Sequence, residues 1–111
     1  MTTTETEDKT YNGWTNYETW LVKLWTDNEY AFYLRQTDLA NEAREVPIDD
    51  PFDLGITQEQ ASLRWLEEAY RDMVKEWVYG DEPPACLATD LLGAALSEVN
   101  WREIAEALLD D

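Results

Sequence analysis

Histidine is absent from this chain of 111 residues, and cysteine occurs once. Without histidine the chain lacks the usual proton carrier near neutral pH, which excludes Ser-His-Asp and Cys-His catalytic arrangements. Zinc sites need several Cys or His ligands, and one thiol cannot form an internal disulfide. That thiol, Cys86, stands in an apolar stretch, so we expect it to be buried and unreactive.

A glycine-rich phosphate-binding loop is also missing, which leaves carboxylates as the remaining reactive groups. Asp49, Asp50, Asp53 and Glu59 offer oxygen ligands for Ca²⁺ or Mg²⁺, but their spacing does not match an EF-hand loop. A solvated loop is the preferred interpretation. We therefore expect a protein that is not an enzyme and that holds no metal and no cofactor.

Long apolar runs are lacking as well. No stretch approaches the ~20 apolar residues of a membrane-spanning helix. The first ten residues, MTTTETEDKT, contain neither the basic nor the apolar region of a signal peptide. We expect a cytoplasmic protein that makes no membrane contact.

Hydrophobic residues nevertheless make up 44% of the chain, and six of them are tryptophans. This is enough apolar surface for the core of one domain of ordinary size. Residues 1–10 contain no apolar side chain after Met1, and we expect them to form a disordered acidic tail. Residues 11–111 are expected to form a single α-helical domain.

The first predicted helix runs from about Asn16 to Asp27, because Asn16 can cap its first turn. Its apolar residues recur at helical spacing within an arc of about 140°. We expect that arc to face the core, and it consists of Tyr17, Trp20, Leu21, Leu24 and Trp25. A second helix with a weaker pattern is predicted over about 28–44, followed by a proline-containing loop at 46–55.

Three more helices are predicted in the second half of the chain. The longest covers about 57–79 and begins with a capping box made by Thr57 and Gln60. Its predicted core face lies on one arc of about 140° and consists of Leu63, Leu66, Ala69, Tyr70, Met73, Val74 and Trp77. The next, about 85–97, is apolar on most sides and is expected at the centre of the fold. The last begins at Asn100, which can form a capping box with Glu103. The fold class is therefore all-α, a compact bundle of four to five helices, with Trp20, Trp25, Trp77 and Trp101 expected in its core.

Two segments resemble a known family. They are YNGWTNYETWLVKLW at 11–25 and VNWREIAEALL at 99–109. They are similar to segments of a family of small uncharacterised proteins that carry an N-Y-E-T-W motif and are encoded by viruses, plasmids and mobile elements of bacteria and archaea. The resemblance implies a genomic context in which small acidic inhibitors of host defence are common. It implies no particular functional residues.

Negative charge is the outstanding property of the composition. Asp and Glu number 25 against 8 Lys and Arg, so the net charge is −17. Most of it falls on residues 38–59, which sum to −6, and on residues 81–111, which sum to −7. A charge of this sign repels nucleic acid and anionic membranes and attracts basic surfaces.

Carboxylates spaced like phosphates can substitute for a polyanion. Residues four apart on a helix are separated by a rise of ~6 Å, and Asp38–Glu42 has this step. The acidic residues predicted to bind a partner are Asp38, Glu42, Glu45, Asp49, Asp50, Asp53, Glu103, Glu106 and Asp110. The predicted partner is a protein with a basic nucleic-acid-binding surface, such as a CRISPR effector or a restriction enzyme, which the chain would inhibit by DNA mimicry. Direct binding to nucleic acid is not expected.

Other interpretations of the same composition stay open. Acidic surfaces with few lysines also suit proteins that work in high salt, and such a chain can be a helical adaptor that binds through an aromatic surface. Trp14 and Trp65 are candidates for that role, because Trp14 precedes the first helix and Trp65 falls on the polar side of the longest one. A lid over the core explains Trp14 equally well, and cover by a neighbouring helix is the preferred explanation for Trp65. The sequence does not decide the oligomeric state.

Overall fold

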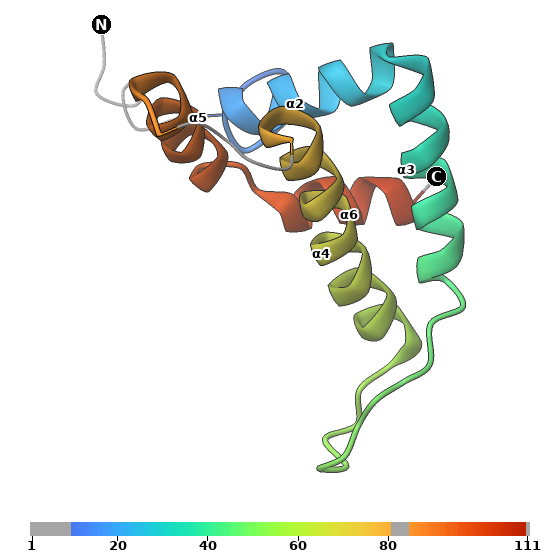
Figure 1. The fold of residues 1–111 in the computed structure, drawn as a ribbon. Helices are drawn as coiled ribbons and strands as arrows, with labels where there is room; N and C mark the ends of the chain where they lie inside the picture. The colour runs from blue at the N-terminus through green and yellow to red at the C-terminus, as the bar shows by residue number, and fades with distance from the viewer. Residues whose placement is uncertain (1–9, 81–84, 111) are drawn as a thin grey trace, which may run out of the picture.

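The computed structural model describes residues 10–80 and 85–110, and the regular elements in those ranges are all α-helices. They follow one another as α2 (Tyr17–Asn28), α3 (Tyr30–Ala43), α4 (Gln58–Tyr79), α5 (Leu87–Ser97) and α6 (Trp101–Leu109), as Figure 1 shows. The predicted all-α fold of four to five helices is confirmed. The predicted tail, apart from Thr10, lies outside the described residues.

Helix ends lie where local capping chemistry places them. The Asn16 side chain accepts a hydrogen bond from the Thr19 N–H at the start of α2, and Asn100 does the same for Glu103 at the start of α6. Thr57 and Gln60 form the predicted capping box, in which each side chain bonds to the backbone N–H of the other residue. Gly80 ends α4 with a φ of +69°, a conformation that favours glycine.

The core is built from α3, α4 and α6. Figure 1 shows α6 running between α4 and α3, and these three helices contact one another broadly. The predicted core face of α4 is confirmed in its central turns, where Leu66, Tyr70 and Val74 are buried. Ile104, Ala105 and Leu108 of α6 are buried against them, and α3 adds Leu39, Ala40 and Ala43.

The prediction that α2 buries its apolar stripe is wrong. Its fully buried side chains are Thr19 and Thr26, which the sequence pattern placed outside the stripe. Trp25, expected in the core, is 56% exposed, and Tyr17 and Leu24 are also exposed. Trp20 and Leu21 are half-buried. Of the other predicted core tryptophans, Trp101 packs on the core half-buried and Trp77 stacks on Phe32 with ring centroids 4.0 Å apart.

Two sets of hydrogen bonds explain this orientation of α2. The Thr26 hydroxyl lies 2.8 Å from the buried Tyr70 hydroxyl of α4 and donates to the Lys23 carbonyl. Since one hydroxyl has one proton, Tyr70 is then the donor to Thr26. The Thr19 hydroxyl accepts from the Asn100 N–H at 2.8 Å and donates to Asn16. We call Thr19, Thr26, Tyr70 and Asn100 the polar seam.

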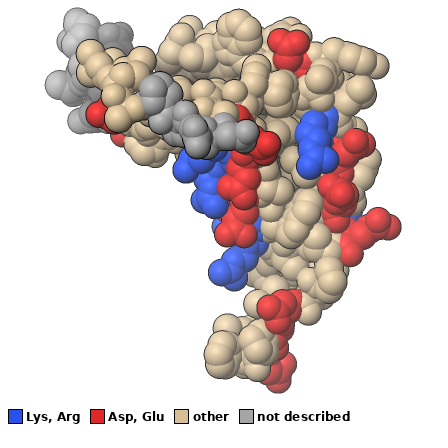
Figure 2. Space-filling model, viewed as in Figure 1, with Lys and Arg blue, Asp and Glu red and all other residues tan. Residues whose placement is uncertain are grey.

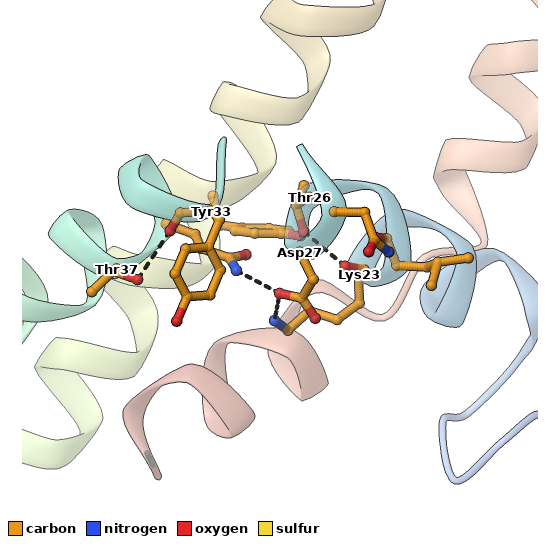
Figure 3. A network of polar contacts seen from close by, with 9 residues as sticks. Lys23, Thr26, Asp27, Tyr33 and Thr37 are labelled. Carbon is orange, nitrogen blue, oxygen red and sulfur yellow. Dashed lines mark hydrogen bonds and ion pairs between the residues drawn. The ribbon is translucent and has the colours of Figure 1, made fainter. Parts of the chain in front are cut away.

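A second polar contact joins α2 to α3 at the corner between them. The Asp27 carboxylate pairs with Lys23 one turn earlier and accepts a hydrogen bond of 2.6 Å from the Gln36 amide, as Figure 3 shows for the labelled residues. Gln36 is buried, so this bond holds a polar side chain of α3 against α2. It reinforces the orientation that the polar seam imposes.

The expectation that the fourth predicted helix lies at the centre is also wrong. This helix, α5, stands away from the other helices in Figure 1, and Leu87 and Leu91 are 73% and 60% exposed. Of its residues only Leu96 is buried. The reason is that α6, which starts a few residues later, occupies the position between α3 and α4. Cys86 occupies the N-cap position of α5 and is exposed, which corrects the expected buried thiol.

The polar seam predicts coupled effects of Thr26 and Tyr70 on stability. Thr26→Val should lower the free energy of unfolding by about 1–3 kcal/mol, because it leaves the buried Tyr70 hydroxyl without its partner. The double variant Thr26→Val with Tyr70→Phe should recover part of that loss, because neither polar group remains. Urea unfolding of the four proteins in this cycle measures the coupling, and strictly additive losses would contradict it.

Burial of Tyr70 also predicts a pH dependence. Desolvation raises the pKa of the Tyr70 hydroxyl above its ordinary value of 10.0. The unfolded chain therefore loses this proton first, and the stability contributed by the neutral hydroxyl is present below pH 10 and declines as the pH rises above it. Unfolding measured from pH 8 to 11 should show a steeper decline for the native chain than for Tyr70→Phe, and equal slopes would argue against it.

Candidate functional site

The acidic residues predicted on α3 form one exposed row. Asp38 and Glu42 are a single turn apart on the side of the helix opposite its buried residues, and Glu45 follows just after the helix ends. Figure 2 shows acidic side chains over the C-terminal half of α3. None of the three forms an ion pair or side-chain hydrogen bond with any described residue, so their charges face solvent. We call Asp38, Glu42 and Glu45 the α3 acidic row.

The predicted acids of the loop between α3 and α4 divide into two kinds. Asp49 and Asp53 are exposed, whereas the Asp50 carboxylate accepts hydrogen bonds from the backbone N–H groups of Leu54, Gly55 and Ile56, at 2.8, 2.9 and 3.1 Å. The bond to Leu54 is the main cause of the lowered pKa of Asp50. Asp50 therefore closes the loop, and this use competes with its predicted role as a partner contact.

The acids of α6 divide in the same way. Glu103 is half-buried, and its carboxylate accepts a hydrogen bond of 2.9 Å from the backbone N–H of Thr15. Glu106 and Asp110 are exposed, and Glu106 has only a long ion pair of 4.0 Å with Arg102. We call Glu106 and Asp110, together with Glu59 at the start of α4, the α6 acidic cluster.

This cluster surrounds an open groove between α4 and α6. The groove has a volume of about 620 Å³ and is lined by Glu59, Glu103, Glu106, Asp110 and Arg44, among others. The Arg44 guanidinium donates to the carbonyls of Leu108 and Leu109, each at 3.3 Å, and so satisfies the free C-terminal carbonyls of α6. The walls of the groove are therefore mostly acidic, and the Arg44 guanidinium that lines it is engaged in capping α6.

Only one residue of the α3 acidic row lines a groove. Glu42 lines a space of about 350 Å³ between α3 and α4 that is also lined by Arg35, Trp65, Asp72 and Glu76. The groove of the α6 acidic cluster instead combines Glu59, from residues 38–59, with Glu106 and Asp110, from residues 81–111. The two predicted acidic regions therefore meet at this groove, whereas its lining includes no residue of the α3 acidic row.

Trp14 and Trp65, the aromatic residues predicted to bind a partner, keep only part of their surface in solvent. Both are half-buried and pack against the core. Trp14 belongs to a tight turn in which it and Tyr11 exchange two backbone hydrogen bonds of 2.8 Å. Trp65 instead lines two grooves beside α4. Its preferred interpretation, cover by neighbouring helices, agrees with this placement.

Exposed apolar side chains that the sequence did not predict at the surface occur on α2 and in the first turns of α3. We call five of them the aromatic face: Tyr17, Leu24, Trp25, Tyr30 and Leu34. Tyr30 is 73% exposed. The spacing of apolar residues did identify the apolar stripe on α2. It did not show that this stripe faces solvent, because Thr19 and Thr26 on the opposite side are buried by partners that lie far away in sequence.

Groups that could support metal or thiol chemistry are few. Within residues 10–80 and 85–110, no cluster of three His, Cys, Asp or Glu side chains is arranged to hold a metal ion. Hydrogen bonds from the Thr89 side chain and backbone lower the pKa of the exposed Cys86 thiol.

Across residues 10–80 and 85–110, no helix combines the length and the apolar composition of a membrane span.

The two segments that resemble a known family meet in space. Asn16 donates through its amide to the Glu98 carbonyl at 2.6 Å, and the Asn100 amide donates to the Thr15 hydroxyl at 3.2 Å. Together with the Thr15–Glu103 and Thr19–Asn100 bonds, they tie the start of α2 to the start of α6. These motif residues therefore have a structural role.

Comparison with known protein families gives a match over most of the chain. The sequence model of a family described as a family of unknown function (DUF7249) matches residues 7–105. No curated protein and no solved structure matches the chain.

The role assigned to Asp50 predicts a local effect on the loop. Asp50→Ala should speed amide hydrogen exchange at Leu54, Gly55 and Ile56, because all three N–H groups lose their acceptor. Asp49→Asn removes the same charge without removing such a bond and serves as the control. Protected amides in Asp50→Ala would show that the carboxylate does not hold the loop closed.

Proposed function

Because the chain belongs to the DUF7249 family, whose function is unknown, we propose a function from its own surface chemistry. The protein acts by binding and not by catalysis, and it occupies the basic, nucleic-acid-binding surface of a protein partner. The partner is a host defence complex that holds DNA or RNA in a basic channel, such as a CRISPR effector or a restriction enzyme. An origin in a virus or mobile element is part of the same proposal.

One observation carries this proposal: the carboxylates are almost all uncompensated. Within the described part of the chain, only Asp27, Asp72 and Glu106 form ion pairs, and those of Asp72 and Glu106 are long, at 3.9 and 4.0 Å. Neutralisation by nearby arginines would have removed the basis for mimicry. Unpaired charges instead produce a field that steers and holds a basic partner.

Spacing along the helices supports the same function. Asp38 and Glu42 differ by four residues on α3, as do Glu106 and Asp110 at the end of α6. These steps correspond to a rise of ~6 Å, similar to the separation of neighbouring phosphates along one strand. Lys and Arg side chains that bind a phosphate row can bind such a carboxylate row and release counterions in the same way.

The internal hydrogen bonds narrow the set of contact residues. Asp50 and Glu103 are committed to the loop and to Thr15, so the binding role falls on the others. These are the α3 acidic row, Asp49, Asp53 and the α6 acidic cluster. Glu59, an acid of the 38–59 segment, enters this set because it lines the same groove as Glu106 and Asp110.

A helical adaptor adapted to high salt is a second candidate. The uncompensated acids fit it equally well, and the exposed Trp25 and Tyr30 offer an aromatic binding surface. The two candidates differ in their response to salt. Binding through carboxylates weakens steeply as salt rises, whereas binding through apolar contacts survives.

Competition with DNA tests the first candidate. The native chain should displace a labelled DNA duplex from a purified CRISPR effector or restriction enzyme at about 0.1 M salt, and far less at 0.5 M. Neutralising the α3 acidic row by Asp38→Asn, Glu42→Gln and Glu45→Gln should weaken inhibition about tenfold, since each surface ion pair contributes roughly 0.2–1 kcal/mol. Neutralising the α6 acidic cluster by Glu59→Gln, Glu106→Gln and Asp110→Asn should weaken inhibition by about the same factor.

A control variant with the same change in charge is available. Glu18→Gln, Glu68→Gln and Asp90→Asn also remove three negative charges, but these residues belong to neither the α3 acidic row nor the α6 acidic cluster. Inhibition that falls equally in all three variants would reveal a net-charge effect with no defined contact surface. Inhibition unaffected by salt and by every neutralisation would exclude the proposed function.

A further inference from the structure

We propose that the aromatic face and the α3 acidic row form one docking surface for a protein segment that carries an apolar block next to a block of Lys and Arg. This inference rests on the proposed function, because it assumes a basic protein partner. It adds the apolar half of the interface and the separation of the partner's apolar and basic residues into two blocks.

The first support is the defined orientation of α2. Thr19 and Thr26 are fully buried, and each hydroxyl is satisfied by a specific partner, Asn100 and Tyr70 respectively. Turning α2 to bury its apolar stripe would break both bonds and leave the Tyr70 hydroxyl unpaired in the core. The outward position of Leu24 and Trp25 is therefore a stable property of the fold. Exposed apolar side chains of this kind mark interaction sites.

The second support is the distribution of charge around this face. Residues 28–37 sum to zero in a chain whose net charge is −17, with Glu29 balanced by Arg35. On α2, Asp27 is paired with Lys23. Figure 2 shows mostly uncharged surface over the region where α2 meets α3. The net charge of this region is thus close to zero, as expected for a surface that becomes dry on binding.

The third support is the continuity of one ridge along α3. Tyr30, Leu34, Asp38 and Glu42 occupy successive i, i+4 positions, and all four are exposed. The first two are apolar and the last two are acidic, over a rise of ~18 Å. A helix or extended segment that lies along this ridge contacts apolar side chains at one end and carboxylates at the other.

Charge complementarity decides the occupant. A partner segment with Leu or aromatic residues opposite Tyr30 and Leu34, and Lys or Arg opposite Asp38 and Glu42, matches both halves. A second copy of the chain leaves the acidic half unmatched and brings together two chains of net charge −17. An anionic membrane surface is repelled for the same reason.

Two synthetic helical peptides of about 18 residues and identical composition test whether the apolar and basic residues must form separate blocks. One carries Leu and Trp in its first half and Lys and Arg in its second half, and the other carries the same residues interspersed. The block peptide should bind the full-length chain about tenfold more tightly in fluorescence anisotropy, because only it places both kinds of contact in register. Equal affinities of the two peptides would overturn the proposal.

Variants assign the two halves. Trp25→Ala and Leu34→Ala should each weaken block-peptide binding about tenfold at low and high salt alike, whereas Asp38→Asn with Glu42→Gln should weaken it only at low salt. Phe52→Ala removes a side chain that is 80% exposed at the loop and should leave affinity unchanged. Tyr30→Ala is a further test, since a side chain so exposed contributes little to folding.

Other outcomes separate this inference from the proposed function. Sedimentation that reveals a dimer dissociated by Trp25→Ala would assign the aromatic face to a second copy and overturn the inference. Displacement of DNA that depends on the acidic residues but not on Trp25 or Leu34 would leave the proposed function standing while the inference fails. Tighter binding of the block peptide, without any displacement of DNA from the effector or restriction enzyme, would instead exclude the proposed function.

Discussion

The hydrogen bond between Thr26 and Tyr70 is the interaction on which the surfaces of this protein depend. It lies in the core, where an unpaired hydroxyl is costly, and it works together with the bond between Thr19 and Asn100. These two contacts turn the polar side of α2 inward. The apolar side of α2 is consequently exposed to solvent, and the part of the aromatic face on α2 follows from the burial of Thr19 and Thr26.

The acidic residues serve two separate purposes. Asp50 and Glu103 accept backbone hydrogen bonds and hold a loop and a helix start in place. Most of the others in the described part of the chain face solvent without a cationic partner. Since charges of one sign repel, such a surface opposes folding unless salt or a bound partner screens it. This cost is the physical reason to connect the acidity with binding or with a saline environment.

Placement of α6 determines the rest of the architecture. Its short length lets it fit between α3 and α4, and its N-terminus is tied to α2 by the bonds of Asn100 and Glu103. α5 is left beside this core, with Leu87 and Leu91 in solvent. The same arrangement opens the groove that the α6 acidic cluster lines, so fold and candidate site have a common origin.

Sequence alone determined the features that depend on neighbouring residues. Helix ends follow from the caps at Asn16, Thr57 and Asn100, and the core face of α4 follows from the periodicity that contains Leu66, Tyr70 and Val74. The candidate acids of α3 were likewise found from their spacing. Tertiary structure decided which side of α2 is buried, where α5 lies, and which acids are already engaged. The reason is distance along the chain: Thr26 meets Tyr70 across 44 residues and Asn100 meets Thr19 across 81, and no local pattern contains such pairs.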